Sequence, residues 1–162
     1  PLTASSPARP SGSSRCAARS ELPALAEEVG RRLAEAGVTV VCGAGGGVME
    51  AAARGAAEAG GRVIGIVQGE SIATANPYCT EVVASGIGHA RNLSVVSSGQ
   101  VVIAVGSEWG TLSEIGFARA IDRTVVALRS WTLEGRERME GAPGVVPVET
   151  PADAVAAALA AL

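Results

Sequence analysis

Short runs of apolar, mostly β-branched residues recur along the chain and predict the strands of a buried sheet. A run that is apolar at nearly every position is typical of a strand covered on both faces, as in parallel sheets. The run at 145–148 contains Pro147, which has no N–H to donate, so this run predicts an edge strand. The other predicted strands are 38–42, 62–67, 80–84, 101–105 and 124–128.

Between these runs, apolar positions recur with the period of about 3.6 residues that indicates amphipathic helices. Ser20 is a good N-cap for the first helix, and Gly37 would end it. Thr111 and Glu114 fit a capping box that would open a later helix, and Thr150 would cap the last one. The apolar faces predicted for the first, second and last helices are Leu22, Leu25, Ala26, Val29 and Leu33; Met49, Ala53, Ala56 and Ala57; and Val155, Leu159 and Leu162.

Strands that alternate with helices predict an α/β fold, in which helices cover both faces of a mostly parallel sheet. Residues 1–19 differ from the rest, because they are rich in Pro, Ser, Ala and Arg and contain one large aliphatic side chain, Leu2. Such a segment cannot bury enough apolar surface to offset the entropy of ordering, so we expect residues 1–19 to be disordered. Residues 20–162 are long enough for one domain with its own core.

The composition narrows the possible functions. A net charge of −3 gives no general attraction to nucleic acid or to an anionic membrane surface. The three cysteines show no CxxC spacing, which argues against a disulfide framework or a zinc site and fits a reducing cytoplasm. No apolar run approaches the roughly 18 residues that a membrane span needs. We therefore expect a cytoplasmic protein without a metal site and without nucleic-acid or membrane partners.

Two glycine-rich stretches are the main candidates for a ligand site. Residues 43–47 (GAGGG) follow the strand at 38–42, and residues 106–111 (GSEWGT) follow the strand at 101–105. Unpaired backbone N–H groups at such strand-to-helix turns bind phosphate and other anions, and the carboxyl ends of parallel strands meet at one rim of a sheet. The first stretch is not the dinucleotide fingerprint, because Val48 stands where the last glycine is required. An ordinary turn with a well-capped helix is the alternative interpretation.

Four segments, in this order and spacing, resemble the LOG-type Rossmann-like superfamily: GAGGGVMEAA, ANPYC, SGIGHARN and GSEWGTLSE. That superfamily includes cytokinin riboside monophosphate phosphoribohydrolases, molybdenum cofactor carrier proteins and the distant DNA-processing protein A domain. The ARN and GTLSE segments resemble the cofactor-carrier branch most. The resemblance covers about residues 20–130 and implies a Rossmann-like three-layer fold and a homo-oligomer. It also implies a strand ahead of the first helix, where this chain has residues 1–19, so we expect the first strand to be missing or replaced by a segment foreign to the fold.

By the same resemblance, Arg91 would hold the ligand and Glu114 would help to break an N-glycosidic bond, as in the phosphoribohydrolases. Asn92 stands where those enzymes have lysine, and residues 106–108 stand where they have Pro-Gly-Gly. A structural interpretation is open for each residue: Glu114 as the acid of a capping box, and Arg91 as a solvated helix residue. Trp109 suits stacking on a base or pterin ring, or simply covering a hydrophobic gap.

Two functions are therefore predicted. The first is a binding or carrier protein for a phosphate-bearing small molecule, either a nucleotide or a molybdopterin-type cofactor, with no cofactor required. The alternative is a phosphoribohydrolase that cleaves nucleoside 5′-monophosphates, with Arg91 and Glu114 as catalytic residues. The candidate ligand-binding residues are Gly43, Gly45, Gly46, Gly47, Arg91, Asn92, Gly106, Gly110 and Thr111.

Overall fold

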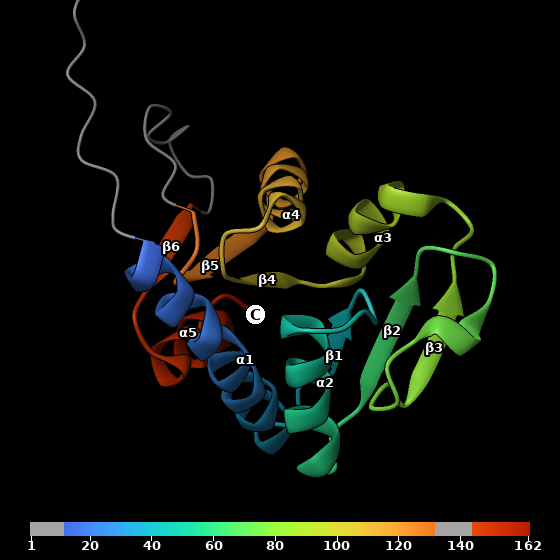
Figure 1. The fold of residues 1–162 in the computed structure, drawn as a ribbon, viewed down its shortest axis with the longest axis horizontal. Coiled ribbons are helices and arrows are strands. Elements are labelled where there is room, and N and C mark those ends of the chain that lie inside the picture. The colour runs from blue at the N-terminus through green and yellow to red at the C-terminus, as the bar shows by residue number, and fades with distance from the viewer. Residues whose placement is uncertain (1–11, 132–143) are drawn as a thin grey trace, which may run out of the picture.

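Helices and strands alternate along the chain, as the hydrophobic pattern predicts (Figure 1). The computed structural model describes residues 12–131 and 144–162, and of residues 12–19 the backbone alone. The helices are α1 (Gly12–Glu35), α2 (Val48–Glu58), α3 (Arg91–Ser98), α4 (Trp109–Ala120) and α5 (Pro151–Leu159), with short 3-10 turns at Ile72–Thr74 and Gly88–Ala90. The strands are β1 (Val40–Cys42), β2 (Val63–Val67), β3 (Glu81–Ala84), β4 (Val101–Val105), β5 (Thr124–Leu128) and β6 (Val145–Val148).

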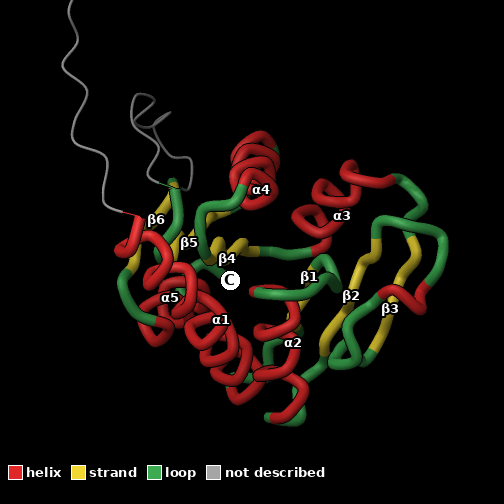
Figure 2. Tube along the Cα trace, viewed as in Figure 1, coloured by secondary structure: helices red, strands yellow, loops and turns green. Residues whose placement is uncertain are grey.

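Every strand pair in the described residues is parallel, and the pairs form two sheets. The first has the order β1-β2-β3, with Val40 opposite Val63, and the second has the order β4-β5-β6, with Val101 opposite Thr124. The strand that contains Pro147, β6, lies at the edge of the second sheet, as predicted. Figures 1 and 2 show α1, α2 and α5 on one side of the strands and α3 and α4 on the other. The α/β class and the three-layer arrangement are therefore confirmed.

Strand pairing does not join the two sheets. Among the described residues, β1 pairs with β2 alone and β4 with β5 alone, so each has one unpaired edge, and both strands lie in the middle of the molecule (Figure 1). The described part of the chain begins with α1, so the expectation of a missing first strand stays a prediction. The burial of β4 reflects its unpaired edge. All of its residues except Ala104 are half-buried, whereas β5, paired on both sides, buries all but Thr124.

The start of α1 differs from the prediction. The helix begins at Gly12, so Ser20 lies inside it rather than at its N-cap, and Pro23 is also inside the helix. Residues 1–11 lie outside the described residues. The prediction that the N-terminal segment is foreign to the fold therefore stays a prediction.

The predicted helix faces are confirmed in part. Buried members are Ala26, Val29, Ala53, Ala56 and Val155. In the last predicted helix, however, Leu159 is 41% exposed, and Leu162 lies beyond the end of α5 and is 56% exposed. The small residues Ala154 and Ala158 of α5 face the core instead. Small side chains at the contact let this helix lie close to the second sheet.

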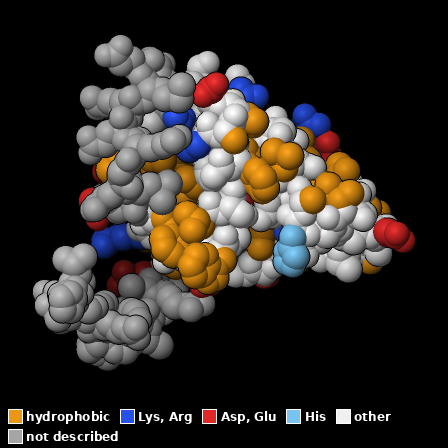
Figure 3. Space-filling model, turned by 90° about the horizontal axis from the view of Figure 1, so that it is seen from above, with side chains coloured by type: hydrophobic (Ala, Val, Ile, Leu, Met, Phe, Trp, Pro, Cys, Tyr) orange, Lys and Arg blue, Asp and Glu red, His pale blue; other side chains and the backbone are white. Residues whose placement is uncertain are grey.

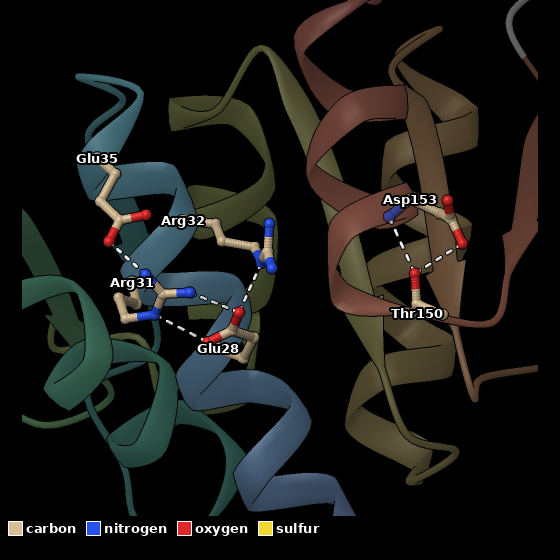
Figure 4. Close-up of polar contacts among 6 residues, drawn as sticks. All are labelled: Glu28, Arg31, Arg32, Glu35, Thr150 and Asp153. Carbon is tan, nitrogen blue, oxygen red and sulfur yellow. Dashed lines mark hydrogen bonds and ion pairs between the residues drawn. The ribbon is translucent and has the colours of Figure 1, made fainter.

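Local polar contacts stabilise α1 and α5 (Figure 4). On α1, Arg31 and Arg32 each donate a hydrogen bond of 2.6 Å to Glu28, and the bond from Arg31 is the main reason that the pKa of Glu28 is lowered to about 2. On α5, the N-cap prediction is confirmed, because Thr150 Oγ1 accepts a hydrogen bond of 3.2 Å from the Asp153 N–H. Exposed ion pairs contribute at most about 1 kcal/mol each, so these contacts support single helices and do not determine the fold.

Two glycines allow α1 and α2 to pack very closely. A Cβ atom at Gly30 would lie 2.0 Å from the Ala52 carbonyl oxygen, and one at Gly55 would lie 2.0 Å from the Glu27 carbonyl oxygen. Beside this contact, Arg54 Nη2 donates a hydrogen bond of 2.5 Å to Glu27 Oε2 across the two helices. Since α1 also contacts α5, β1 and β4, its position is fixed by both sheets.

We expect Gly30→Ala and Gly55→Ala each to lower the free energy of unfolding by about 1–3 kcal/mol, because the added methyl group must push the two helix backbones apart. Gly116→Ala is the matched control. Gly116 is also inside a helix, but a Cβ there would meet no described atom within 4 Å. Helix propensity predicts that this control gains up to about 1 kcal/mol. Urea denaturation measures all three variants, and equal effects would contradict the close-packing argument.

Candidate functional site

The first glycine-rich loop, residues 43–47, leads from the carboxyl end of β1 into α2. Ala44 has a φ of 55° and Gly47 a φ of 66°, both in the left-handed region, so the loop turns sharply. Gly47 directly precedes α2, whose first N–H groups have no acceptor within the helix. The predicted strand, loop and helix are therefore present, and they place backbone donors at the carboxyl rim of the first sheet.

Arg91, the first residue of α3, is 5% exposed, although arginine is rarely buried without an ionic partner. Its guanidinium group lies against the first loop: a Cβ at Gly43 would be 1.7 Å from Arg91 Nη1, so a larger residue there would require Arg91 to move. Arg91 Nε is buried and has no hydrogen-bond partner among the described residues. The interpretation of Arg91 as a solvated helix residue is therefore wrong.

Glu114, in α4, is half-buried and close to Arg91. Burial raises the pKa of Glu114, while the positive charge of Arg91 opposes this shift. Because α4 begins at Trp109, with Glu108 at the N-cap position, Thr111 lies within the first turn and the predicted capping box is wrong. A carboxyl group with a raised pKa beside an arginine can take up or release a proton at a higher pH than an exposed one.

The neighbouring Asn92 points toward α4 and ties α3 to it. Asn92 Nδ2 donates a hydrogen bond of 2.9 Å to Ser113 Oγ, which in turn donates one of 2.7 Å to the Gly110 carbonyl oxygen. Asn92 is 9% exposed whereas Ser113 is exposed, so this is a partly buried link between the N-terminal parts of the two helices. Sequence reasoning missed Ser113, because no local pattern connects it to α3.

The second glycine-rich stretch has two distinct parts. Gly106 has a φ of 81°, and a Cβ there would lie 2.9 Å from Leu22 Cδ1 of α1. Its carbonyl oxygen accepts a hydrogen bond of 2.6 Å from Ser130 Oγ. Gly110 and Thr111, by contrast, lie in the first turn of α4, and no described atom would contact a Cβ at Gly110. Gly106 is therefore packed against α1, whereas Gly110 is open.

A shallow depression of about 510 Å³ lies between α3 and α4, and we call it the α3–α4 depression. Trp109 stands at its side and is 76% exposed. The Trp109 ring packs on Trp131 with 5.4 Å between centroids, and Trp131 Nε1 donates a hydrogen bond of 3.2 Å to the Glu108 carbonyl oxygen. Figure 3 views the molecule from this side and shows hydrophobic side chains with few charged ones among them. The lining residues are His89, Ala90, Asn92, Trp109, Gly110, Ser113 and Phe117.

The structure brings Gly43, Arg91 and Glu114 together at the carboxyl end of β1, and the α3–α4 depression adjoins them through Asn92. Gly106 lies apart from this cluster, against α1. Another depression, of about 590 Å³, lies along α1 and α2 and away from the cluster. Its lining includes Arg31, which pairs with both Glu28 and Glu35. Sequence reasoning also assigned no role to Asn76, although the Asn-Pro pair in ANPYC is a turn signal.

This fold, with a glycine loop and a buried arginine at the carboxyl rim, defines a Rossmann-like α/β protein of the LOG-type superfamily. The chain belongs to the SLOG cluster4 family, whose model matches residues 11–155. The resemblance inferred from the four sequence segments is thereby confirmed. Among the described helices, none is both long and apolar enough to cross a membrane.

Similar solved structures include proteins that handle the molybdenum cofactor. The molybdenum cofactor binding protein from the phototrophic bacterium Rippkaea orientalis is 27% identical, with a TM-score of 0.76 over 86% of each chain. The molybdenum cofactor carrier protein of Chlamydomonas reinhardtii is 29% identical, with a TM-score of 0.76 over 88% of each chain. An uncharacterised protein of Archaeoglobus fulgidus is 38% identical over 105 residues, which are 65% of this chain and 69% of that protein.

We expect Glu114→Gln to change how stability depends on pH. Burial raises the pKa of Glu114 above its ordinary value of 4.5, so the folded state favours the protonated carboxyl group. The stability that this group contributes is complete below a pH of about 4.5 and is lost as the pH rises through the raised pKa. The glutamine variant cannot ionise and should gain stability relative to the unchanged protein as the pH rises. Urea denaturation at a series of pH values measures this difference, and a constant difference would contradict the burial argument.

Proposed function

We propose that the protein binds and carries a small molecule that bears a phosphate group. The observation that supports this most directly is Arg91, a buried arginine whose Nε lacks a hydrogen-bond partner among the described residues. A buried donor without an acceptor is costly, and a phosphate oxygen is the kind of acceptor that a guanidinium group binds best. The first glycine loop lies directly against this guanidinium group.

Backbone donors and a positive charge would act together on the phosphate. The N–H groups of Gly45, Gly46 and Gly47 precede the N-terminus of α2, where an anion is also favoured by the helix dipole. Burial raises the pKa of Glu114 and so makes this carboxyl group easier to protonate, and a protonated Glu114 would leave the charge of Arg91 available to an oxyanion. Asn92, from the start of α3, and Gly110 and Thr111, from the start of α4, would contact the ligand. Gly43 and Gly106 would shape the two loops.

The rest of the ligand would be a planar ring that lies in the α3–α4 depression. Trp109 supports this, since it is exposed and yet held in place by its contact with Trp131. An indole ring fixed at the side of an apolar depression is a good stacking surface for a heterocycle. A nucleotide and a molybdopterin-type cofactor both combine a phosphate with such a ring. The likeness to molybdenum cofactor binding and carrier proteins favours the second ligand.

The alternative function is a phosphoribohydrolase that acts on nucleoside 5′-monophosphates. It is supported by Glu114, because a half-buried carboxyl group with a raised pKa can serve in proton transfer. In that reaction Arg91 would hold the substrate, and Glu114 would stabilise the positive charge that develops on the ribose or activate water. Asn92 is bonded to Ser113 and supplies no positive charge where those enzymes have lysine.

We also propose that the protein acts in the cytoplasm as a homo-oligomer. Cys42 and Cys79 are free thiols, which fits a reducing compartment. Near the edge of the first sheet, Ile72, Val83 and Ile87 are 60%, 51% and 51% exposed, and such side chains are suited to contact with a second copy.

We expect AMP to bind without being cleaved, and Arg91→Ala to weaken AMP binding at least about tenfold, because charge-assisted hydrogen bonds to phosphate are lost. Isothermal titration calorimetry measures affinity, and chromatography measures any release of adenine. Arg62→Ala is the control, since Arg62 is exposed and pairs with Glu81 at 2.5 Å, away from the loop. If neither AMP nor molybdopterin binds, the proposal is wrong. Adenine release that is lost in Glu114→Gln would establish the hydrolase instead.

We expect Trp109→Ala to weaken AMP binding about 5- to 100-fold and to leave the binding of inorganic phosphate unchanged, because stacking contributes about 1–3 kcal/mol per base. The chain has two tryptophans, so Trp131→Phe leaves Trp109 as the single tryptophan fluorophore. In that variant AMP should quench the fluorescence. An equal loss of AMP and phosphate binding in Trp109→Ala would contradict a stacking role.

A further inference from the structure

We propose that Asn76 is a positioning residue that aims the backbone N–H groups of the first glycine loop at the ligand. Asn76 lies between the turn at Ile72–Thr74 and β3, outside both glycine-rich stretches. This proposal rests on the proposed anion site, but the placement of the loop can be measured without any ligand.

Asn76 holds two consecutive carbonyl groups of the loop. Its backbone N–H donates a hydrogen bond of 2.9 Å to the Ala44 carbonyl oxygen. Its side-chain Nδ2 donates one of 3.1 Å to the Gly45 carbonyl oxygen. Both neighbouring peptide groups of the loop are thus fixed from one side by a single residue.

The planarity of the peptide bond determines what these two bonds do to the loop donors. The described residues contain no cis peptide bond, and in a trans peptide the C=O and N–H point in opposite directions. When Asn76 draws the carbonyl groups of Ala44 and Gly45 toward itself, the N–H groups of Gly45 and Gly46 therefore point away from it. Two successive N–H groups that point the same way form an anion-binding concavity.

The loop needs such a restraint because Ala44 has an unfavourable backbone conformation. Its φ of 55° is uncommon for a residue with a Cβ, and Ala44 is 1% exposed. The methyl group is packed over β2, since a Cβ at Gly65 would lie 2.8 Å from the Ala44 Cβ. The bonds from Asn76 help to hold Ala44 in this conformation.

Asn76 is itself held rigidly. Its Oδ1 accepts hydrogen bonds from the Tyr78 N–H at 3.2 Å and from Cys79 Sγ at 3.6 Å. Burial raises the pKa of the Cys79 thiol to about 11, so the thiol keeps the proton that it donates. With Oδ1 fixed by two donors, Nδ2 is directed at Gly45, as positioning requires.

The test compares Asn76→Asp, Asn76→Ala and the unchanged protein. Aspartate keeps the acceptor for Tyr78 and Cys79 but loses the Nδ2 donor, so Asn76→Asp isolates the bond to Gly45. Without ligand, amide hydrogen exchange and NMR shifts of Gly45 and Gly46 should change in both variants. AMP affinity should fall about tenfold or more in both, as expected for the loss of one hydrogen bond and of the preorganised loop. Ser71→Ala, in the preceding turn, is the control and should change neither readout, because Ser71 Oγ bonds to Ala73 N–H and not to the loop.

A pH series separates positioning from a general structural effect. Below the carboxyl pKa, which is about 3.9 in model peptides, the aspartate introduced by Asn76→Asp carries a proton that it can donate to the Gly45 carbonyl oxygen. The exchange pattern of Gly45 and Gly46 in Asn76→Asp should therefore return toward that of the unchanged protein on acidification, whereas Asn76→Ala should not recover. If either variant unfolds, the measurement is repeated with Ala44→Gly added, which removes the Cβ that makes the left-handed φ unfavourable.

The outcomes distinguish this proposal from the proposed function. Unchanged Gly45 and Gly46 amides in Asn76→Asp would overturn the positioning role, whether or not AMP binds. Changed amides with weakened AMP binding would support it. Changed amides in a protein that binds neither AMP nor molybdopterin would support the positioning of the loop and overturn the anion site.

Discussion

The close contact between α1 and α2 at Gly30 and Gly55 is the constraint on which the rest of the structure depends. In the described residues no strand pairing joins the two sheets, so packed helices must fix their relative position. On one side α1 packs on α2 and also on α5, and on the other side α3 packs on α4. If the backbones of α1 and α2 were further apart, α1 would not lie at the same time against β1 and against Gly106 after β4.

The candidate site also depends on the contact between α1 and α2, because its residues come from both sheets. Gly43 follows β1 of the first sheet, whereas Glu114 belongs to α4, which covers the second. Arg91 lies between them, and its guanidinium group occupies the space that a side chain at position 43 would fill. A small shift of one sheet relative to the other would expose Arg91 or press it into the loop. The burial of Arg91 therefore depends on the close contact between α1 and α2.

The sequence predicts the elements better than the contacts between them. The strands at 101–105 and 124–128 match to the residue, because runs that are apolar on both faces have few alternatives. The predicted starts of α1 and α4 are wrong, since Ser20 and Thr111 are good local caps but the helices continue N-terminal to them. The contact of Gly43 with Arg91 could not be predicted, because a glycine in a loop does not indicate which side chain fills the space beside it.

Because the strands form two separate sheets, a ligand that contacts both would also connect them. A phosphate-bearing molecule held by the first loop and by the start of α4 would contact both sheets at the rim where their strands do not pair. Its binding free energy would then add directly to the stability of the folded arrangement, because the unfolded chain offers no such pair of contacts. In this chain, binding of the ligand would therefore stabilise the folded arrangement of the two sheets.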